Sequence, residues 1–357
     1  MKDRVKQSDF PWILANVDAS NSVLSQPEPF VTLSVGGFKV TFLGVVETRG
    51  KDGKIPATHP LRVADLTFQP HQDIVGNFSN LKAQEDADVL VGLTHLGSED
   101  DRNLARNHTF FDVIIGGHSH ERINEVVNGT PVLQADAGLE LLGRIDFVIE
   151  NKTVIDYTVS MINLQTATEV DTDLENAIAA YNDNPTFAQV VGQSDVDHFS
   201  FDVGCFYTTA LKEFMEVDFT IQNLGGVRSG INQGPITLFE IYTMDPFNNG
   251  SVVFTKTVGE YESIFCESGS RFFYSGINIS AGNGDIQIVD ENGIPLPDDQ
   301  ELTMGVNDFI PAVFDNLFDI REAEVRDYTT AEAIIGYLEN INSTIDFEGC
   351  MRVIACD

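Results

Sequence analysis

The sequence predicts an α/β protein of two domains. It has 357 residues, and a typical domain takes roughly 100–200 residues. A helical stretch followed by a buried-type strand occurs twice in the first half, which favours an α/β layer. A helix near the middle, with Pro185 just beyond its end, is the best junction. The expected organisation is a first domain over 1–165, a linker helix over 166–188 and a second domain over 189–357.

The composition excludes several classes of partner. Lys and Arg number 21 against 55 Asp and Glu, for a net charge of −34, which repels nucleic acid and anionic lipid. Hydrophobic residues make up 42%, enough to build cores. No apolar run approaches the roughly 18 residues of a membrane span. Met1–Arg4 lacks the apolar stretch of a signal peptide, and the compartment stays open.

Four cysteines are too few for a disulfide scaffold and show no C-x-x-C spacing. Cys350 and Cys356 lie six residues apart near the end of the chain. They could close a small loop or remain free thiols, and the residues leave both alternatives open.

In the first half, short apolar runs alternate with turns. Val31–Val35 and Lys39–Val46 flank a glycine pair and predict a hairpin. Asp73–Ala87 is expected to be a helix, and the apolar run Ala87–Leu93 a buried strand. Phe111–Ile115 is a second run of this type. Further strands are expected over Thr130–Ala135 and Gly143–Glu150.

The second half begins with a predicted helix over Asp171–Asn184, whose N-cap is Asp171 or Thr172. Phe206–Glu216 and Val258–Cys266 also have a helical pattern. The last helix is expected over Thr329–Ile341. The strands are expected over Phe219–Gln222, Ser251–Lys256 and within Asn278–Asp290.

Three of the seven histidines follow the ends of buried-type strands. His95 follows one strand in T-H-L-G, and His118 and His120 follow the next in G-G-H-S-H. Ligands of open α/β sheets bind at carboxyl ends of strands, and two residues that are two apart in an extended segment face one side. Imidazole suits a divalent ion such as Zn, Mn, Fe or Co. The sequence therefore predicts a metal site, the alternative being capping or core histidines.

These motifs resemble a known family. T-H-L-G, D-V-I-I-G-G-H-S-H, N-L-G-G-V-R and the strand Phe10–Val17 are similar to the 5′-nucleotidase/UDP-sugar hydrolase family of calcineurin-like metallophosphoesterases. The resemblance implies a four-layer first domain, a β-sandwich flanked by helices, followed by a 5′-nucleotidase C-terminal α/β domain. It also implies a site for two divalent metals (Zn, Mn or Co), with His95 and His118 as ligands and His120 helping to hold the second ion. Such proteins are usually periplasmic, cell-surface or secreted.

The family's D-x-H, G-D and G-N-H-E motifs precede the F-P-x-x-x-A-N-V strand, yet only nine residues precede Phe10 and none carries those motifs. Two-metal chemistry needs a carboxylate that bridges the ions. The expectation is an N-terminally truncated member with an incomplete four-layer domain over 1–165. We expect low metal occupancy and weak or absent activity in this chain alone, unless an N-terminal segment or an oligomer complements it.

A candidate substrate site lies in the second domain, the substrate-binding domain by resemblance. Asn223 and Arg228, the first and last residues of N-L-G-G-V-R, are candidate substrate-binding residues. Arg228 offers a planar fork for phosphate or carboxylate, the alternative being a turn with a surface arginine. By resemblance, Phe247 and Phe309 would stack on a flat base. Asp315 would accept hydrogen bonds from the ribose hydroxyls. With 25 phenylalanines in the chain, the alternative for both rings is a core position.

Two departures from the family pattern affect this site. Val313-Phe314 stands where the family has a glycine pair. The stretch Asp197–Leu211, with Gly204-Cys205 in place of G-N, contains no arginine, so one phosphate clamp is lost. The predicted function is hydrolysis of nucleotide phosphoesters. The alternatives are a non-catalytic protein that binds a nucleoside or nucleotide, and a hydrolase of another ester.

Overall fold

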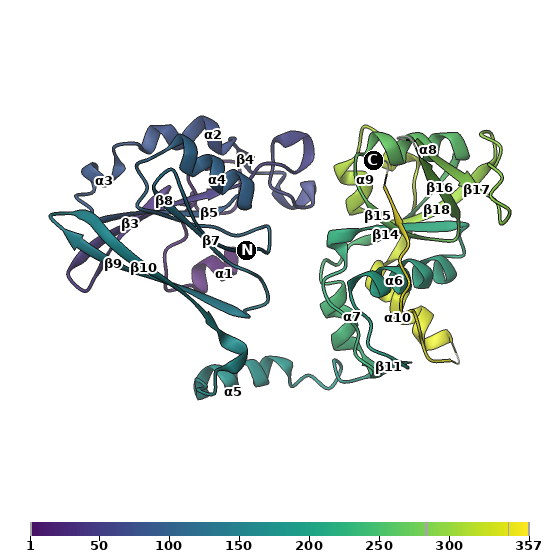
Figure 1. Ribbon diagram of the computed structural model, residues 1–357. Coiled ribbons are helices and arrows are strands. Elements are labelled where there is room, and N and C mark those ends of the chain that lie inside the picture. The colour runs from purple at the N-terminus through teal and green to yellow at the C-terminus, as the bar shows by residue number, and fades with distance from the viewer. Residues whose placement is uncertain (1, 283–284, 342, 356–357) are drawn as a thin grey trace. The chain divides into compact units, whose positions relative to one another are not determined.

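The computed structural model describes residues 2–282, 285–341 and 343–355, and the side chain of Ser200 is not among the parts described. The chain divides into two compact units, Met1–Glu169 and Val170–Asp357. Each unit is an α/β structure built on a six-stranded sheet (Figure 1). Within the described residues, no helix is both long and apolar enough to cross a membrane.

The first unit is built on a sheet of strand order β2-β3-β5-β6-β8-β7. Its four central strands run parallel, and β2 and β7 pair antiparallel at the two edges. The predicted hairpin is confirmed as β2 and β3, and the two apolar runs as β5 and β6. The bounds are β2 Phe30–Val35, β3 Phe38–Val46, β5 Val89–His95, β6 Val113–Ile115, β7 Arg122–Val127 and β8 Thr130–Ala135.

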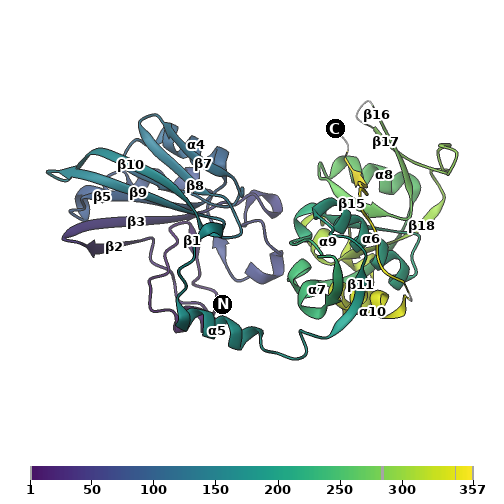
Figure 2. The same cartoon turned by 60° about the horizontal axis from the view of Figure 1, so that its bottom comes forward.

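A long antiparallel ribbon, β9 (Leu141–Glu150) with β10 (Thr153–Asn163), covers one face of this sheet. Its alternate apolar residues, such as Phe147 and Val159, pack on Val91 of the sheet. Helices cover the other face, where Leu104 of α4 (Ser98–Asn107) packs in the cluster that includes Leu90. Both views show the ribbon lying across β3 and β5 (Figures 1 and 2).

The helix expected over Asp73–Ala87 is broken in the structure. It consists of α2 (His71–Ile74), a 3-10 turn over Val75–Phe78, and α3 (Leu81–Gln84). The segment G-N-F-S-N between the two α-helical pieces is rich in Gly, Asn and Ser, which are poor formers of a helix interior. The remaining elements of this unit are α1 Lys2–Gln7, β1 Val17–Asp18, β4 Thr67–Phe68, and 3-10 turns at Lys51–Gly53, Pro60–Val63 and Leu164–Thr166.

The second unit has a sheet of order β19-β14-β18-β12-β15-β20, in which β12 and β18 are the parallel pair. Residues of β14 alternate between two cores, because successive side chains of a strand point to opposite faces. Val253 packs with α6, α7 and α10, whereas Phe254 packs with α8 and α9. These helices lie on the two sides of the sheet in Figure 1.

Most predicted elements of this unit are confirmed within a few residues. Asp171 is the N-cap of the first helix, since its side chain accepts the N–H groups of Asp173 and Leu174. The helices are α5 Thr172–Asn182, α6 Ser200–Met215, α7 Leu238–Met244, α8 Val258–Glu267, α9 Phe309–Val313 and α10 Thr330–Asn340. The strands are β11 Val190–Ser194, β12 Phe219–Asn223, β13 Gly234–Thr237, β14 Gly250–Thr257, β15 Phe272–Ser275, β16 Asn278–Gly282, β17 Asp285–Val289, β18 Glu301–Asn307, β19 Glu324–Thr329 and β20 Val353–Ile354.

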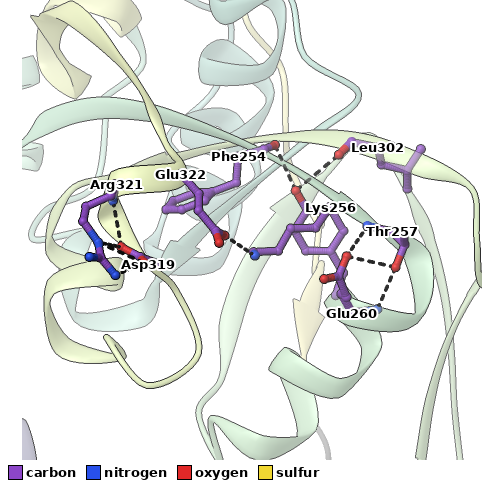
Figure 3. A network of polar contacts seen from close by, with 9 residues as sticks. Phe254, Lys256, Thr257, Glu260, Leu302, Asp319, Arg321 and Glu322 are labelled. Atoms are coloured by element: carbon purple, nitrogen blue, oxygen red, sulfur yellow. Dashed lines mark hydrogen bonds and ion pairs between the residues drawn. The ribbon is translucent and has the colours of Figure 1, made fainter.

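Polar contacts fasten the start of α8 to the sheet (Figure 3). The hydroxyl of Thr257 and the carboxylate of Glu260 form a capping box. The Tyr261 hydroxyl donates to the carbonyls of Phe254 and Leu302 at 2.9 and 3.3 Å. The capping box satisfies backbone N–H groups at the helix start, and the Tyr261 hydroxyl ties the helix to carbonyls of β14 and β18.

The disulfide pattern differs from both alternatives considered for Cys350. Cys350 is bridged to Cys205 of α6, 145 residues away in sequence, with Cα atoms 6.3 Å apart. A loop between Cys350 and Cys356 is therefore wrong, as is a free thiol at Cys350; Cys356 lies outside the described residues. Cys266 is also disulfide-bonded. The fold decides the pairing, because β20 pairs with β15 beside α6.

Candidate functional site

The histidine motifs meet at one edge of the first unit's sheet. His95 is the last residue of β5, and His118 follows β6 after two glycines. Because these strands are parallel, their carboxyl ends lie at the same edge. The rings of His95 and His118 lie with centroids 5.1 Å apart at an interplanar angle of 84°. Two of the three predicted ligands are therefore brought together.

The segment from His118 to His120 is bent rather than extended. Both residues have positive φ, 85° and 55°, which is uncommon for residues other than glycine. An extended segment, the condition under which His118 and His120 would face one side, is therefore not met here. His118 is half-buried and His120 is exposed. Burial lowers the pKa of His118 below its ordinary value; Glu47 opposes this change, and His95 and Arg49 add to it.

Glu47 and Arg49 also lie at this edge, and the sequence interpretation missed both. Glu47 follows β3 and is 2% exposed. Its carboxylate accepts the N–H of Ala57 at 2.6 Å and that of Arg49. The Arg49 guanidinium donates to the Leu96 carbonyl at 2.6 Å. The available signal was an acidic residue that directly follows an apolar strand.

The donor set at this edge fits part of a metal site. Two imidazoles suit a borderline divalent cation, and His95 and His118 supply them. Nowhere in residues 2–282, 285–341 and 343–355 do three or more His, Cys, Asp or Glu side chains form a group that could hold a metal ion. Glu47 is directed to backbone N–H groups instead. Other ligands of a cation here would come from water, substrate or another polypeptide segment.

In the second unit, amide side chains join the carboxyl ends of the parallel strands β12 and β18. The Asn307 side chain donates to Asn223 Oδ1 at 3.3 Å and to the Gln222 amide oxygen. In turn, Asn307 Oδ1 accepts the backbone N–H of Ile310 in α9, at 3.0 Å. The turn after β12 requires Gly226, because a Cβ there would lie 2.6 Å from Gln222 Nε2. Asn223 is thus held at a strand end.

Arg228 lies beside Phe247, which is on a separate loop. The Arg228 Cζ atom is 5.7 Å from the centroid of the Phe247 ring, within the range of a cation–π contact. The Arg228 backbone N–H donates to the Met244 carbonyl at 2.9 Å. The guanidinium is exposed, and its Nη1 atom donates a long hydrogen bond to Gly225 O at 3.4 Å.

A buried carboxylate anchors the loop that carries Phe247. Asp245 is 2% exposed, and its Oδ2 atom accepts the hydroxyls of Tyr207 and Thr330 at 2.8 and 2.6 Å. Burial raises the pKa of the Tyr207 hydroxyl well above its ordinary value, and the charge of Asp245 adds to this effect. The three side chains come from α6, α10 and the end of α7, so the loop is fixed to the core.

Phe309 begins α9 and is half-buried against the cluster beside α8. Asp315 follows α9 and is exposed. The Phe314 ring packs edge-on to Phe272, with centroids 6.1 Å apart. Phe314 therefore packs against the core where the family pattern has a glycine. The aromatic stacking and ribose roles of these residues stay predictions.

Comparisons with known proteins agree with this arrangement. Residues 179–320 match the family model of the 5′-nucleotidase C-terminal domain. The chain is 28% identical over 282 residues to the trifunctional nucleotide phosphoesterase protein YfkN of Bacillus subtilis, covering 68% of this chain and 19% of that protein. It is 23% identical to the 5′-nucleotidase of Vibrio cholerae, covering 95% of this chain and 73% of that protein. The chain thus spans about a fifth of the length of the Bacillus relative.

A solved 5′-nucleotidase precursor from Thermus thermophilus superimposes with a TM-score of 0.80 at 22% identity, over 97% of this chain and 79% of that one. The sulfate thiohydrolase SoxB of Thermus thermophilus gives a TM-score of 0.75 at 14% identity, covering 95% of this chain and 68% of that one. These likenesses establish a common fold over both units. Residues 179–320 thus match the 5′-nucleotidase C-terminal domain, and the two units together have the fold of solved 5′-nucleotidases.

Proposed function

We propose that this chain binds nucleotides and forms part of a metal-dependent hydrolase of nucleotide phosphoesters. The observation that carries the proposal is the pairing of Arg228 with Phe247, 5.7 Å apart, inside the matched domain. An aromatic face next to an exposed guanidinium suits a flat base joined to an anionic phosphate. The relatives named above as nucleotidases and phosphoesterases support this choice of ligand.

In this proposal the second unit selects the substrate. Arg228 binds the phosphate, Phe247 and Phe309 stack on the base, and Asp315 accepts hydrogen bonds from the ribose. Asn223 lies at the end of β12 and offers amide groups beside the same turn. Residues 166–188 form the linker between the proposed domains, 1–165 and 189–357.

The first unit supplies histidine ligands. His95 and His118 would hold a divalent ion, Zn, Mn or Co, and His120 would help to hold a second. When bound, such ions activate water and neutralise charge on the phosphoryl group. The chain's own part is to orient the two imidazoles and to keep His118 uncharged, which its lowered pKa favours. A neutral imidazole is the form that binds a metal.

We expect hydrolysis by this chain alone to be weak or absent. Among the residues it describes, the structure has no group of three or more His, Cys, Asp or Glu side chains that could hold a metal ion, and a two-metal centre needs a bridging carboxylate. This observation favours, as a second candidate, a nucleotide-binding role without catalysis. A complementing segment or a second subunit would restore hydrolysis. The packed Phe314 ring also favours testing esters other than nucleotides.

Calorimetry with AMP and with adenosine, each with and without Mn²⁺, tests the proposal. We expect both compounds to bind. Arg228→Ala should lower the affinity for AMP by about tenfold, because about one charge-assisted contact is lost, and should change the affinity for adenosine little. Phe247→Leu should weaken both. Arg321→Ala is the matched control, because Arg321 is an exposed arginine of the same unit that pairs with Asp319.

Absence of binding of either compound would contradict the nucleotide proposal. Phosphate release from AMP, measured in parallel, separates an enzyme from a binding protein. If the rate of phosphate release is the same in Arg228→Ala and His95→Ala as in the native chain, the proposed site does not carry out the hydrolysis.

A further inference from the structure

A buried carboxyl group lies between the two loops that carry His95 and His118. Asp101 is in the first turn of α4 and is 0% exposed. Its Oδ1 atom accepts the hydroxyl of Thr94 at 2.6 Å, and Thr94 directly precedes His95. One oxygen of this carboxyl therefore fixes the end of β5.

The other oxygen of Asp101 packs against the second loop. A Cβ built on Gly116 would lie 2.0 Å from Asp101 Oδ2 and 3.3 Å from Thr94 Oγ1. Gly116 thus leaves room for the carboxyl at the point where β6 becomes the loop to His118. The backbones are also joined, since Gly97 N–H donates to Gly117 O at 3.1 Å and Asp101 N–H to Gly97 O at 3.0 Å.

The buried position of Asp101 has an energetic cost. Asp101 Oδ2 has no hydrogen-bond partner among the described residues, and a buried polar atom without a partner costs about 1–3 kcal/mol. Burial raises the pKa of Asp101 to about 7, although the Thr94 hydroxyl acts in the opposite direction.

Asp112, at the opposite edge of the same sheet, provides a contrast. Its carboxylate oxygens accept Lys82 Nζ at 2.8 and 2.7 Å and the N–H of Leu90 at 2.7 Å. This carboxylate joins the amino ends of β5 and β6 with both oxygens satisfied. Asp101 spans the carboxyl ends of the same two strands, and one of its oxygens has no hydrogen-bond partner among the described residues. His95 and His118 follow these strand ends.

We propose that Asp101 is a positioning residue that sets the placement of His95 relative to His118. It acts through Thr94 on one side and through the fit against Gly116 on the other. That Asp101 orients metal ligands rests on the proposed function. That it sets the positions of the two imidazole rings does not. Groups that orient ligands from behind commonly change metal affinity by about 10–100-fold when they are removed.

The test uses the full chain with Asp101→Ala, Asp101→Asn, Gly116→Ala, and the double variant Asp101→Ala/Gly116→Ala. Long-range ¹H–¹⁵N spectra of the metal-free protein report the environments of the His95 and His118 rings. Calorimetry with Zn²⁺ alone reports affinity. Asp112→Asn is the control, because it alters a carboxylate of the same sheet at the far edge.

We expect Asp101→Ala and Gly116→Ala each to shift both ring spectra and to weaken Zn²⁺ binding by about tenfold or more. Asp101→Asn should retain the native spectra, since the amide keeps the shape and an acceptor for Thr94. The double variant should recover part of the native spectra, because removing the carboxyl makes space for the new methyl group. Asp112→Asn should lower thermal stability and leave both rings unchanged.

Unshifted rings in folded Asp101→Ala, or equal shifts in Asp112→Asn, would overturn the proposal. If Asp101→Ala does not fold, the proposal is tested by Gly116→Ala: native His95 and His118 ring spectra in that variant would overturn the proposal. If the native chain shows no Zn²⁺ binding, the proposed metal site fails, and the ring spectra still decide the role of Asp101.

Discussion

The carboxyl-end loops of the two sheets are held in place differently. In the second unit, Asn307 links two strands and α9 through hydrogen bonds, and Asp245 receives two hydroxyls. In the first unit, His118 has a φ of 85° and Asp101 keeps an oxygen without a partner among the described residues. Strain and unsatisfied polar groups concentrate at functional sites. Asp245 Oδ1 of the second unit likewise has no partner among the described residues, and Asn248 has a φ of 52°. The two sets of loops therefore differ in the groups that join them: amides and hydroxyls in the second unit, a carboxyl packed against a glycine in the first.

The pH dependence of stability gives the largest expected effect and tests the cost assigned to Asp101. Its pKa is about 7 in the folded chain against 3.8 as the ordinary value, so the folded state holds a proton that the unfolded state loses. The contribution of Asp101 to the free energy of unfolding is then complete below about pH 4. It is lost as the pH rises through about 7, by up to about 4 kcal/mol. Asp101→Asn should remove this dependence.

Urea unfolding of the first unit between pH 4 and 8, with and without Asp101→Asn, measures the difference. His118 opposes the trend in both proteins, because its lowered pKa makes stability fall as pH drops below about 6.5. Identical pH profiles for the two proteins would show that Asp101 does not titrate in this range.

Removal of the bridge between Cys205 and Cys350 should act on the second unit alone. The Cys205→Ala/Cys350→Ala double variant is expected to lose about 2–4 kcal/mol of unfolding free energy, because the bridge constrains a long segment of the unfolded chain. Hydrogen exchange resolved by unit is the measurement. A comparable loss of protection in β5 or β6 would mean that the units do not unfold separately.

Tyr207→Phe tests how much the hydrogen bonds to Asp245 stabilise the loop of Phe247 in the second unit. It removes one of the two hydroxyls that Asp245 accepts, and we expect a loss of about 1–3 kcal/mol. Binding of AMP should weaken as well, since Asp245 anchors the loop of Phe247. Tyr242→Phe is a suitable control because Tyr242 is exposed on the neighbouring helix. Unchanged AMP affinity in a destabilised Tyr207→Phe protein would separate stability from loop placement.

The smallest effect is expected at the surface pair of Asp319 and Arg321 (Figure 3). Hydrogen bonds from Arg321 lower the pKa of Asp319 to about 2, so Arg321→Ala should raise that pKa. Because the pair is exposed to solvent, no measurable change in stability is expected at pH 7. A carboxyl titration by NMR checks the first part and thermal unfolding the second.

Local patterns were enough for much of the fold. The hairpin of β2 and β3, the strands that end at His95 and before His118, and the cap at Asp171 each depend on neighbours in sequence. The break in the helix over 73–87 also has a local cause, its Gly, Asn and Ser residues, which were outweighed by the apolar spacing.

The amino-acid sequence by itself determined the strand and helix order, the acidic surface, and the placement of histidines at strand ends. Only the tertiary structure decided the partner of Cys350, the approach of Arg228 to Phe247, and the burial of Glu47 and Asp101 at the histidine edge. The physical reason is range: periodicity and caps act over a few residues, whereas burial and pairing depend on segments that only the packed sheets bring together.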